Sequence, residues 1–97
     1  MTRNILKMLS FTKSFADNKD KAKILREKHL LPAIKNGHKI VIDFTGIEST
    51  TQSFVHALIS QACRKYSGIF LELVEFHGCN KYVKEMIKTV INYSMED

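Results

Sequence analysis

Side chains that could carry chemistry are concentrated in one short stretch of the chain, residues 43–54. This stretch contains an aspartate, Asp43, and five hydroxyl side chains: Thr45, Ser49, Thr50, Thr51 and Ser53. The pattern from Ser49 to Gln52 is typical of a helix start, where free backbone amides and the helix dipole stabilise a phosphate group. Two interpretations of these hydroxyls are compatible with each other. Some of them could cap the helix, and one of them could be phosphorylated.

Three other combinations of reactive residues are weaker. Asp43, Ser53 and His56 are the residue types of a hydrolase triad, but no Gly-x-Ser-x-Gly motif surrounds the serine. A zinc site could combine His77 and Cys79 with His56 or Cys63, yet the paired spacings of zinc ligands are absent. No glycine-rich phosphate-binding motif occurs. We therefore expect no enzymatic activity, no metal and no cofactor, and we expect Asp43 to accept hydrogen bonds from backbone amides of the loop that follows it.

The elements that must position these residues alternate between strand and helix. Periodicity and capping signals predict strands over residues 5–11, 40–44 and 69–76 and helices over residues 18–36, 51–67 and 80–94. Asp17 should cap the start of the first helix, Pro32 should kink or restart it, and Gly37 should cap its end. Asn80 should cap the last helix.

The second helix should turn an apolar stripe to the core, formed by Val55, Leu58, Ile59, Ala62 and Tyr66. The strand from Ile40 to Phe44 should be central and covered on both faces, whereas the first strand could be a parallel or an antiparallel edge strand. The alternation favours a layered α/β fold with a mainly parallel central sheet and three main helices. In such folds the loops at the carboxyl ends of the strands form the working surface, which here is the stretch from Asp43 to Phe54.

Length and composition fit one folded domain. The chain has 97 residues, of which 44% are hydrophobic and 26% are charged, so we expect a single domain over residues 1–97. The longest apolar stretches are far shorter than a membrane helix requires. We expect a cytoplasmic protein with no membrane contact and with buried, unpaired thiols at Cys63 and Cys79.

Positive charge is concentrated in the first part of the chain. Residues 1–40 hold ten Lys or Arg and three acids, a net charge of +7, whereas residues 41–97 hold five and seven, a net charge of −2. The first predicted helix carries six of these cations: Lys19, Lys21, Lys23, Arg26, Lys28 and Lys35. This basic face could bind nucleic acid phosphates or an acidic protein partner. The absence of aromatic residues from residues 16–37 favours the protein partner or a merely solvated face.

The run IVIDFTGIESTTQSFVHALI resembles the STAS-like domain family, small bacterial relatives of the anti-sigma factor antagonist (STAS) domain. The family signature is an Asp-Phe-Ser-Gly-Val strand exit followed by a Ser-Phe helix start. Asp43, Gly46, Ser53 and Phe54 match its strand aspartate, its turn glycine and its Ser-Phe pair. The likeness extends from about Ser14 to Tyr93.

The resemblance implies a regulatory module without catalysis. In the antagonists, a partner kinase phosphorylates the first serine of an Asp-Ser-Ser-Gly helix start, but that position is Gln52 here. Only Ser53, with Thr50 or Thr51 beside it, could replace the missing acceptor. The resemblance further implies that the segment from Glu48 to Phe54 docks a protein partner, such as a serine-kinase-type or histidine-kinase-like ATPase. Nucleic-acid binding through the basic first helix is the alternative function.

Overall fold

Three parallel strands form the central sheet of the computed structural model, which describes residues 4–96. Their order is β1 (Asn4–Lys7), β3 (Ile40–Asp43) and β5 (Val74–His77), so β3 is the central strand. The register aligns Leu6 with Ile42 and Ile42 with Phe76. Parallel neighbours require crossover connections, and helices supply them here. The first strand, whose direction the sequence left open, is therefore a parallel edge strand.

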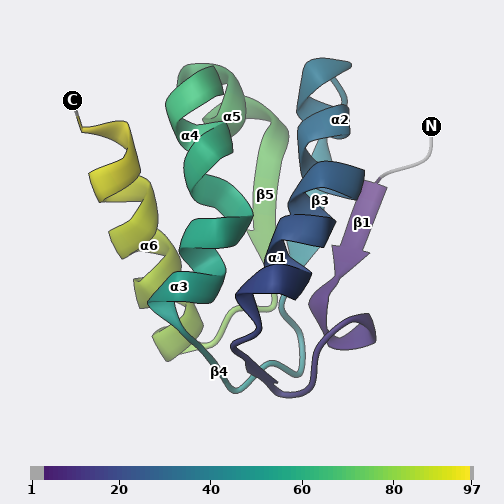
Figure 1. Cartoon of the computed structure of the whole chain (residues 1–97), viewed down its shortest axis with the longest axis vertical. Helices are drawn as coiled ribbons and strands as arrows, with labels where there is room; N and C mark the ends of the chain where they lie inside the picture. The colour runs from purple at the N-terminus through teal and green to yellow at the C-terminus, as the bar shows by residue number, and fades with distance from the viewer. Residues whose placement is uncertain (1–3, 97) are drawn as a thin grey trace.

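The main helices lie in front of this sheet in Figure 1. Leu6 and Ile42 are buried in the core, and the alternation of the strands turns Ile5 and Val41 to the opposite face. Ile5 is 52% exposed, whereas Val41 in the central strand is buried. Burial on both faces of the central strand was expected, and the structure confirms it, because Val41 is buried as well as Ile42. The strand neighbours of Val41 are Ile5 and Glu75.

The first crossover is one continuous helix in three segments: α1 (Lys19–Leu25), the π-helical η2 (Arg26–Leu30) and α2 (Leu31–Lys35). Asn18, and not Asp17 as we predicted, caps its start by accepting from the amides of Asp20 (3.0 Å) and Lys21 (3.2 Å). We predicted a kink or restart of the helix at Pro32. The structure instead contains the π-helical segment η2, which ends at Leu30, two residues before Pro32, and Pro32 has no amide with which to continue the α-helical hydrogen bonds. Gly37 ends the helix with φ +71°.

The second crossover is built in the same way, from α3 (Gln52–Val55), the π-helical η3 (His56–Ser60) and α4 (Gln61–Tyr66). Its predicted apolar stripe is confirmed, because Val55, Leu58, Ile59 and Ala62 are buried and Tyr66 packs partly against the core. The helix ends at Ser67, whose φ is +43°.

A short fourth helix replaces much of the predicted third strand. Residues 69–76 were expected to be extended, but α5 spans Gly68–Leu73 and only the last part forms β5. Phe70 is completely buried, whereas Ile69 and Leu71 are 52% and 57% exposed. One turn of helix places Phe70 and Val74 on the same buried side, and a short apolar run fits helix and strand equally well.

The first strand is also shorter than predicted, because η1 (Met8–Ser10) is a 3₁₀ turn that buries Met8. Beyond it, β2 (Phe15–Ala16) and β4 (Ser49–Thr50) form a separate parallel pair below the main sheet (Figure 1). The closing helix α6 (Lys81–Met95) begins at the predicted cap, Asn80. Within residues 4–96, no helix is long and apolar enough to cross a membrane.

Candidate functional site

The loop that leaves β3 is fixed by the aspartate at its start. The Asp43 carboxylate accepts from the Thr45 amide (2.9 Å) and from the Thr45 hydroxyl (2.6 Å). These bonds, the hydroxyl bond foremost, lower the pKa of Asp43 below its ordinary value of 3.8. Gly78 lies directly against the same turn, since a Cβ there would be 2.7 Å from the Thr45 backbone nitrogen. Asp43 therefore shapes the loop, as expected.

The middle of the loop is tied to the segment before α1. The amide of Glu48 donates to the Ser14 carbonyl (2.8 Å), and the Thr50 hydroxyl donates to the Ala16 carbonyl (2.7 Å). In the short β2–β4 pair, Phe15 lies beside Ser49. Two segments more than thirty residues apart in the sequence thus form a single surface at the carboxyl edge of the sheet.

The helix start separates the predicted hydroxyls into two kinds. The Thr51 hydroxyl accepts from the amide of Phe54 (3.1 Å) and is the cap of α3. Phe54 is completely buried, whereas Gln52 and Ser53 are exposed in the first turn. Of the hydroxyls around this helix start, Ser53 is therefore the one that a partner molecule can reach most directly.

Asn80, which lies outside the predicted site, forms hydrogen bonds with the loop from the start of α6. The Asn80 side-chain amide donates to the Glu48 carbonyl (2.7 Å) and more weakly to the Ile47 carbonyl (3.4 Å), while its oxygen accepts from Val83 in α6. The sequence identified Asn80 as a helix cap but gave no sign that it also binds this loop. The candidate loop is consequently braced by both β2 and α6.

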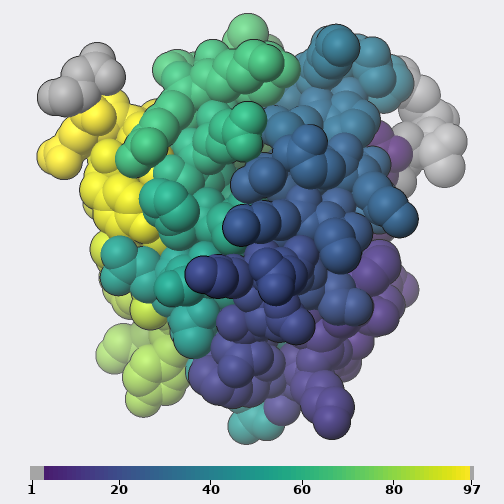
Figure 2. Space-filling model, in the orientation of Figure 1, coloured from purple at the N-terminus to yellow at the C-terminus, as the bar shows by residue number. Residues whose placement is uncertain are grey.

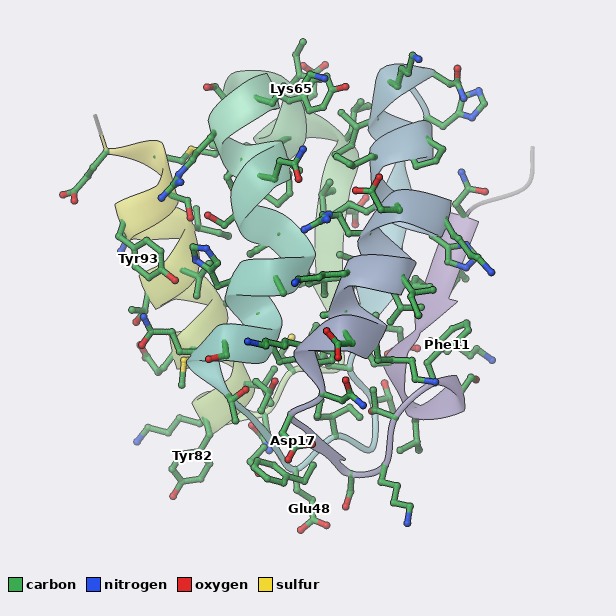
Figure 3. The ribbon with its side chains drawn as sticks, viewed as in Figure 1. Phe11, Asp17, Glu48, Lys65, Tyr82 and Tyr93 are labelled. Atoms are coloured by element: carbon green, nitrogen blue, oxygen red, sulfur yellow. The ribbon has the colours of Figure 1, made fainter. Side chains whose placement is uncertain are left out.

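Exposed apolar side chains surround this braced loop. Phe15 is 50% exposed, Leu9 touches the turn at Gly46, and Phe11 lines the same shallow cavity as Phe15. Tyr82, in the first turn of α6, is 76% exposed. Figure 3 shows Tyr82, Glu48 and Asp17 together at this end of the molecule. We call five of the exposed side chains around this loop the carboxyl edge: Leu9, Phe11, Phe15, Glu48 and Tyr82.

The triad considered from the sequence is not assembled. His56 bonds Tyr93 through Nδ1 (2.9 Å) and stacks on its ring, and Tyr93 is visible on α6 in Figure 3. Asp43 is engaged by Thr45, and it does not line the cavity that Ser53 and His56 share. The described residues contain no group of three His, Cys, Asp or Glu side chains placed to hold a metal ion.

The cysteines are unpaired but not equally buried. Cys63 is completely buried in the core, and this burial raises the pKa of its thiol to about 11. Cys79 is half-buried, and desolvation raises its pKa as well. The expectation of two buried thiols is therefore correct for Cys63 only.

The predicted basic face of the first helix is divided. Lys19, Lys23 and Arg26 line a groove between α1 and the helix that starts at α3. Lys21 and Lys28 line two other cavities, and Lys35 lies at the far end, on α2. The groove also contains two cations outside the predicted basic face, Arg64 and Lys65 of α4. No spacing within one helix indicates that they lie beside Lys23, because their proximity depends on how the two helices pack.

Comparison with known protein families gives one match, over residues 21–84, to the STAS-like domain of unknown function (DUF4325). Comparison with curated proteins gives no match, and comparison with solved structures gives none. The matched segment includes β3, the braced loop, the helix from α3 to α4, and β5. The small α/β fold with its parallel sheet agrees with that family, and since the match covers more than half of the sequence, the chain belongs to the STAS-like domain family.

Proposed function

We propose that this protein is a non-catalytic regulatory module that docks a protein partner at the carboxyl edge. The observation that carries the proposal is the ring of exposed apolar side chains around a loop that is already held in place. Exposed apolar clusters mark protein interaction sites. Phe15 and Tyr82 are at least half exposed and flank Glu48 and Ser49.

The braced loop lowers the conformational entropy that is lost when a partner docks. Hydrogen bonds from Glu48, Thr50 and Asn80 fix the backbone of residues 47–50 before any partner binds. A preorganised surface loses little freedom on association. Aromatic side chains on such a surface provide the large contact areas that dominate binding energy.

The resemblance stated above supports an ATPase of the serine-kinase or histidine-kinase type as the partner. The docking segment proposed from that resemblance, Glu48 to Phe54, coincides with the loop and helix start that form this edge. Ser53 lies exposed at its end, so its hydroxyl is available for contact or for modification.

The test is affinity capture from the source cells with the whole chain as bait, followed by identification of the bound proteins and a titration with the purified partner. We expect Phe15→Ser to weaken binding at least tenfold, because it removes an exposed aromatic contact of the edge. Ser53→Glu should weaken binding through charge and bulk at the helix start. Thr89→Glu adds the same charge at an exposed position on α6 and is the control.

Equal binding by Phe15→Ser and by the unmodified chain would contradict the proposal. Mass spectrometry of the recovered bait shows whether Ser53 carries a phosphate. If the captured protein is an ATPase, the partner class is supported as well.

A further inference from the structure

A basic groove separates α1 from the helix formed by α3, η3 and α4. Its volume is about 710 Å³. The two helices that form its walls, blue and teal in Figure 2, face the viewer there. Five cationic side chains line the groove: Lys19, Lys23, Arg26, Arg64 and Lys65. None of the described residues that line the groove is acidic. Arg26 donates to the Ala57 carbonyl (3.1 Å) across the groove, whereas the other four cations are exposed.

The positive surface continues beyond the groove. Lys65 also lines a second cavity of about 440 Å³, together with Lys35 and Tyr66. The one acid in that cavity, Glu27, is paired with Arg26 (2.8 Å). From Lys19 to Lys35 the helix rises by about 24 Å, at about 1.5 Å per residue. The six cations therefore follow a line rather than enclose a small ligand, and we call them, with Tyr66, the basic track.

The track lacks the features by which proteins usually hold peptides. Both walls of the groove are helices, so it offers no strand edge for pairing, and Ala57 is the only apolar side chain among the described residues that line it. In the second cavity, the apolar side chains other than Tyr66 are Leu31 and Pro32. Peptide recognition by strand addition or by an amphipathic helix needs a sheet edge or an apolar floor. A linear ligand whose attraction is mainly electrostatic fits the track better.

Tyr66 adds a contact suited to nucleobases. The first helix supplies no aromatic residue, but the fold places Tyr66 of the neighbouring helix beside Lys35 and Lys65. Its ring packs partly against the core, and the Lys65 ammonium lies over the ring, 5.5 Å from its centroid. A base that stacks on Tyr66 would take the place of this exposed ammonium. Proteins that bind single strands combine cations along the backbone with aromatic rings on which bases stack.

We propose that the basic track binds single-stranded nucleic acid, with its cations on the phosphates and Tyr66 under a base. The track begins close to the carboxyl edge, because Ser53 of the docking segment and Lys19 at the start of α1 also line the groove, but its other cations extend away from that edge. Figure 3 shows Lys65 at the opposite end of the molecule from Glu48 and Tyr82. The proposal therefore does not depend on the docking proposed above.

The test measures fluorescence anisotropy of a labelled short oligo(dT) with the whole chain over a range of salt concentrations. Affinity should fall with salt, because each neutralised phosphate contributes about 0.7 to the slope of log K against log salt for single strands. We expect the double variant Lys23→Gln/Arg64→Gln to reduce that slope by about 1.4, the share of two contacts. Lys84→Gln/Lys88→Gln on α6 removes the same charge away from the track and should leave the slope unchanged.

Stacking is tested at Tyr66 with variants that keep the packing of the side chain. Tyr66→Leu should reduce affinity about fivefold or more, whereas Tyr66→Phe should retain it. Circular dichroism and thermal unfolding of each variant show whether the fold is intact.

Three results would overturn the proposal. Equal slopes for the track and α6 variants would mean that net charge alone attracts the oligonucleotide. Tighter binding of duplex than of single-stranded DNA would remove the role of Tyr66. A glutamate peptide of the same charge that binds more tightly than oligo(dT) would assign the track to an acidic protein segment.

Discussion

The carboxyl edge and the basic track differ in how the fold prepares them. At the edge, three side chains form hydrogen bonds with the backbone of other residues. The Asp43 carboxylate accepts from the Thr45 amide, the Thr50 hydroxyl donates to the Ala16 carbonyl, and the Asn80 side chain donates to the Glu48 carbonyl. Along the track, only Arg26 makes such a bond, to Ala57, and the remaining cations extend into solvent from two rigid helices. The edge therefore has a fixed shape that can fit one particular protein surface. The track has a pattern of positive charge that can bind single-stranded nucleic acid of many different sequences.

The largest effect should come from filling the space at Gly78. Gly78→Ala combines a left-handed residue, φ +69°, with a Cβ only 2.7 Å from the Thr45 backbone nitrogen. We expect a loss of about 2–4 kcal/mol in the free energy of unfolding, from the conformational strain and the overpacking together. Urea denaturation measures it.

Gly37→Ala is the matched control for Gly78→Ala. Its φ is +71°, but a Cβ there meets nothing within 4 Å. Only the strain of about 1–2 kcal/mol should remain. If both variants lose the same free energy of unfolding, the close packing around Thr45 contributes nothing to stability. The edge would then not be more tightly fixed by the fold than the track.

A medium effect is expected at Asn80, which has two roles. Asn80→Ala removes the cap of α6 and the bond to the Glu48 carbonyl, and should lower the free energy of unfolding by about 1–2 kcal/mol. Asn18→Ala, which removes only the cap of α1, should cost about 1 kcal/mol. Partner capture should weaken with Asn80→Ala, while oligonucleotide binding stays unchanged. Loss of both activities would show that edge and track are not independent.

The smallest effect is the loss of stability expected at low pH, when the Asp43 carboxylate is protonated. Folding lowers the pKa of Asp43, so the Asp43–Thr45 bonds add stability above pH 3.8, and this contribution disappears as the pH falls through the lowered pKa. Thr45→Val removes the hydroxyl bond that lowers the pKa most, and should shift the carboxyl titration of Asp43 upward in an NMR pH series. An unchanged titration would mean that this bond does not favour the ionised carboxylate.

The sequence predicted much of the edge but little of the track. Asp43, Thr51 and Asn80 carry local signals, because a strand exit or a helix cap needs only neighbours within three residues. The contact of Asn80 with Glu48 spans 32 residues and has no such signal. Arg64 and Lys65 join Lys23 only because two crossover helices pack side by side, which the pattern of a single helix does not reveal.

The error at α5 has a similar origin. The run from Ile69 to Leu73 is apolar at nearly every position, so neither period is visible in it. Tertiary packing decides the outcome: Phe70 and Val74, four residues apart, are buried, while Ile69 and Leu71 are exposed, which is the spacing of a helix turn rather than of a strand covered on both faces.

The π-helical segment η3 has a consequence for insertions and deletions in this family. The wide turn of such a segment accommodates one extra residue, which would otherwise turn everything after it by about 100°. Arg64 and Lys65 follow η3, whereas Ser53 precedes it. A homologue that lacks one residue between His56 and Ser60 would form a regular α-helical turn there and keep both its helix start and these two cations in place. A deletion within α4, where no wide turn absorbs it, would instead turn the residues that follow it away from α1.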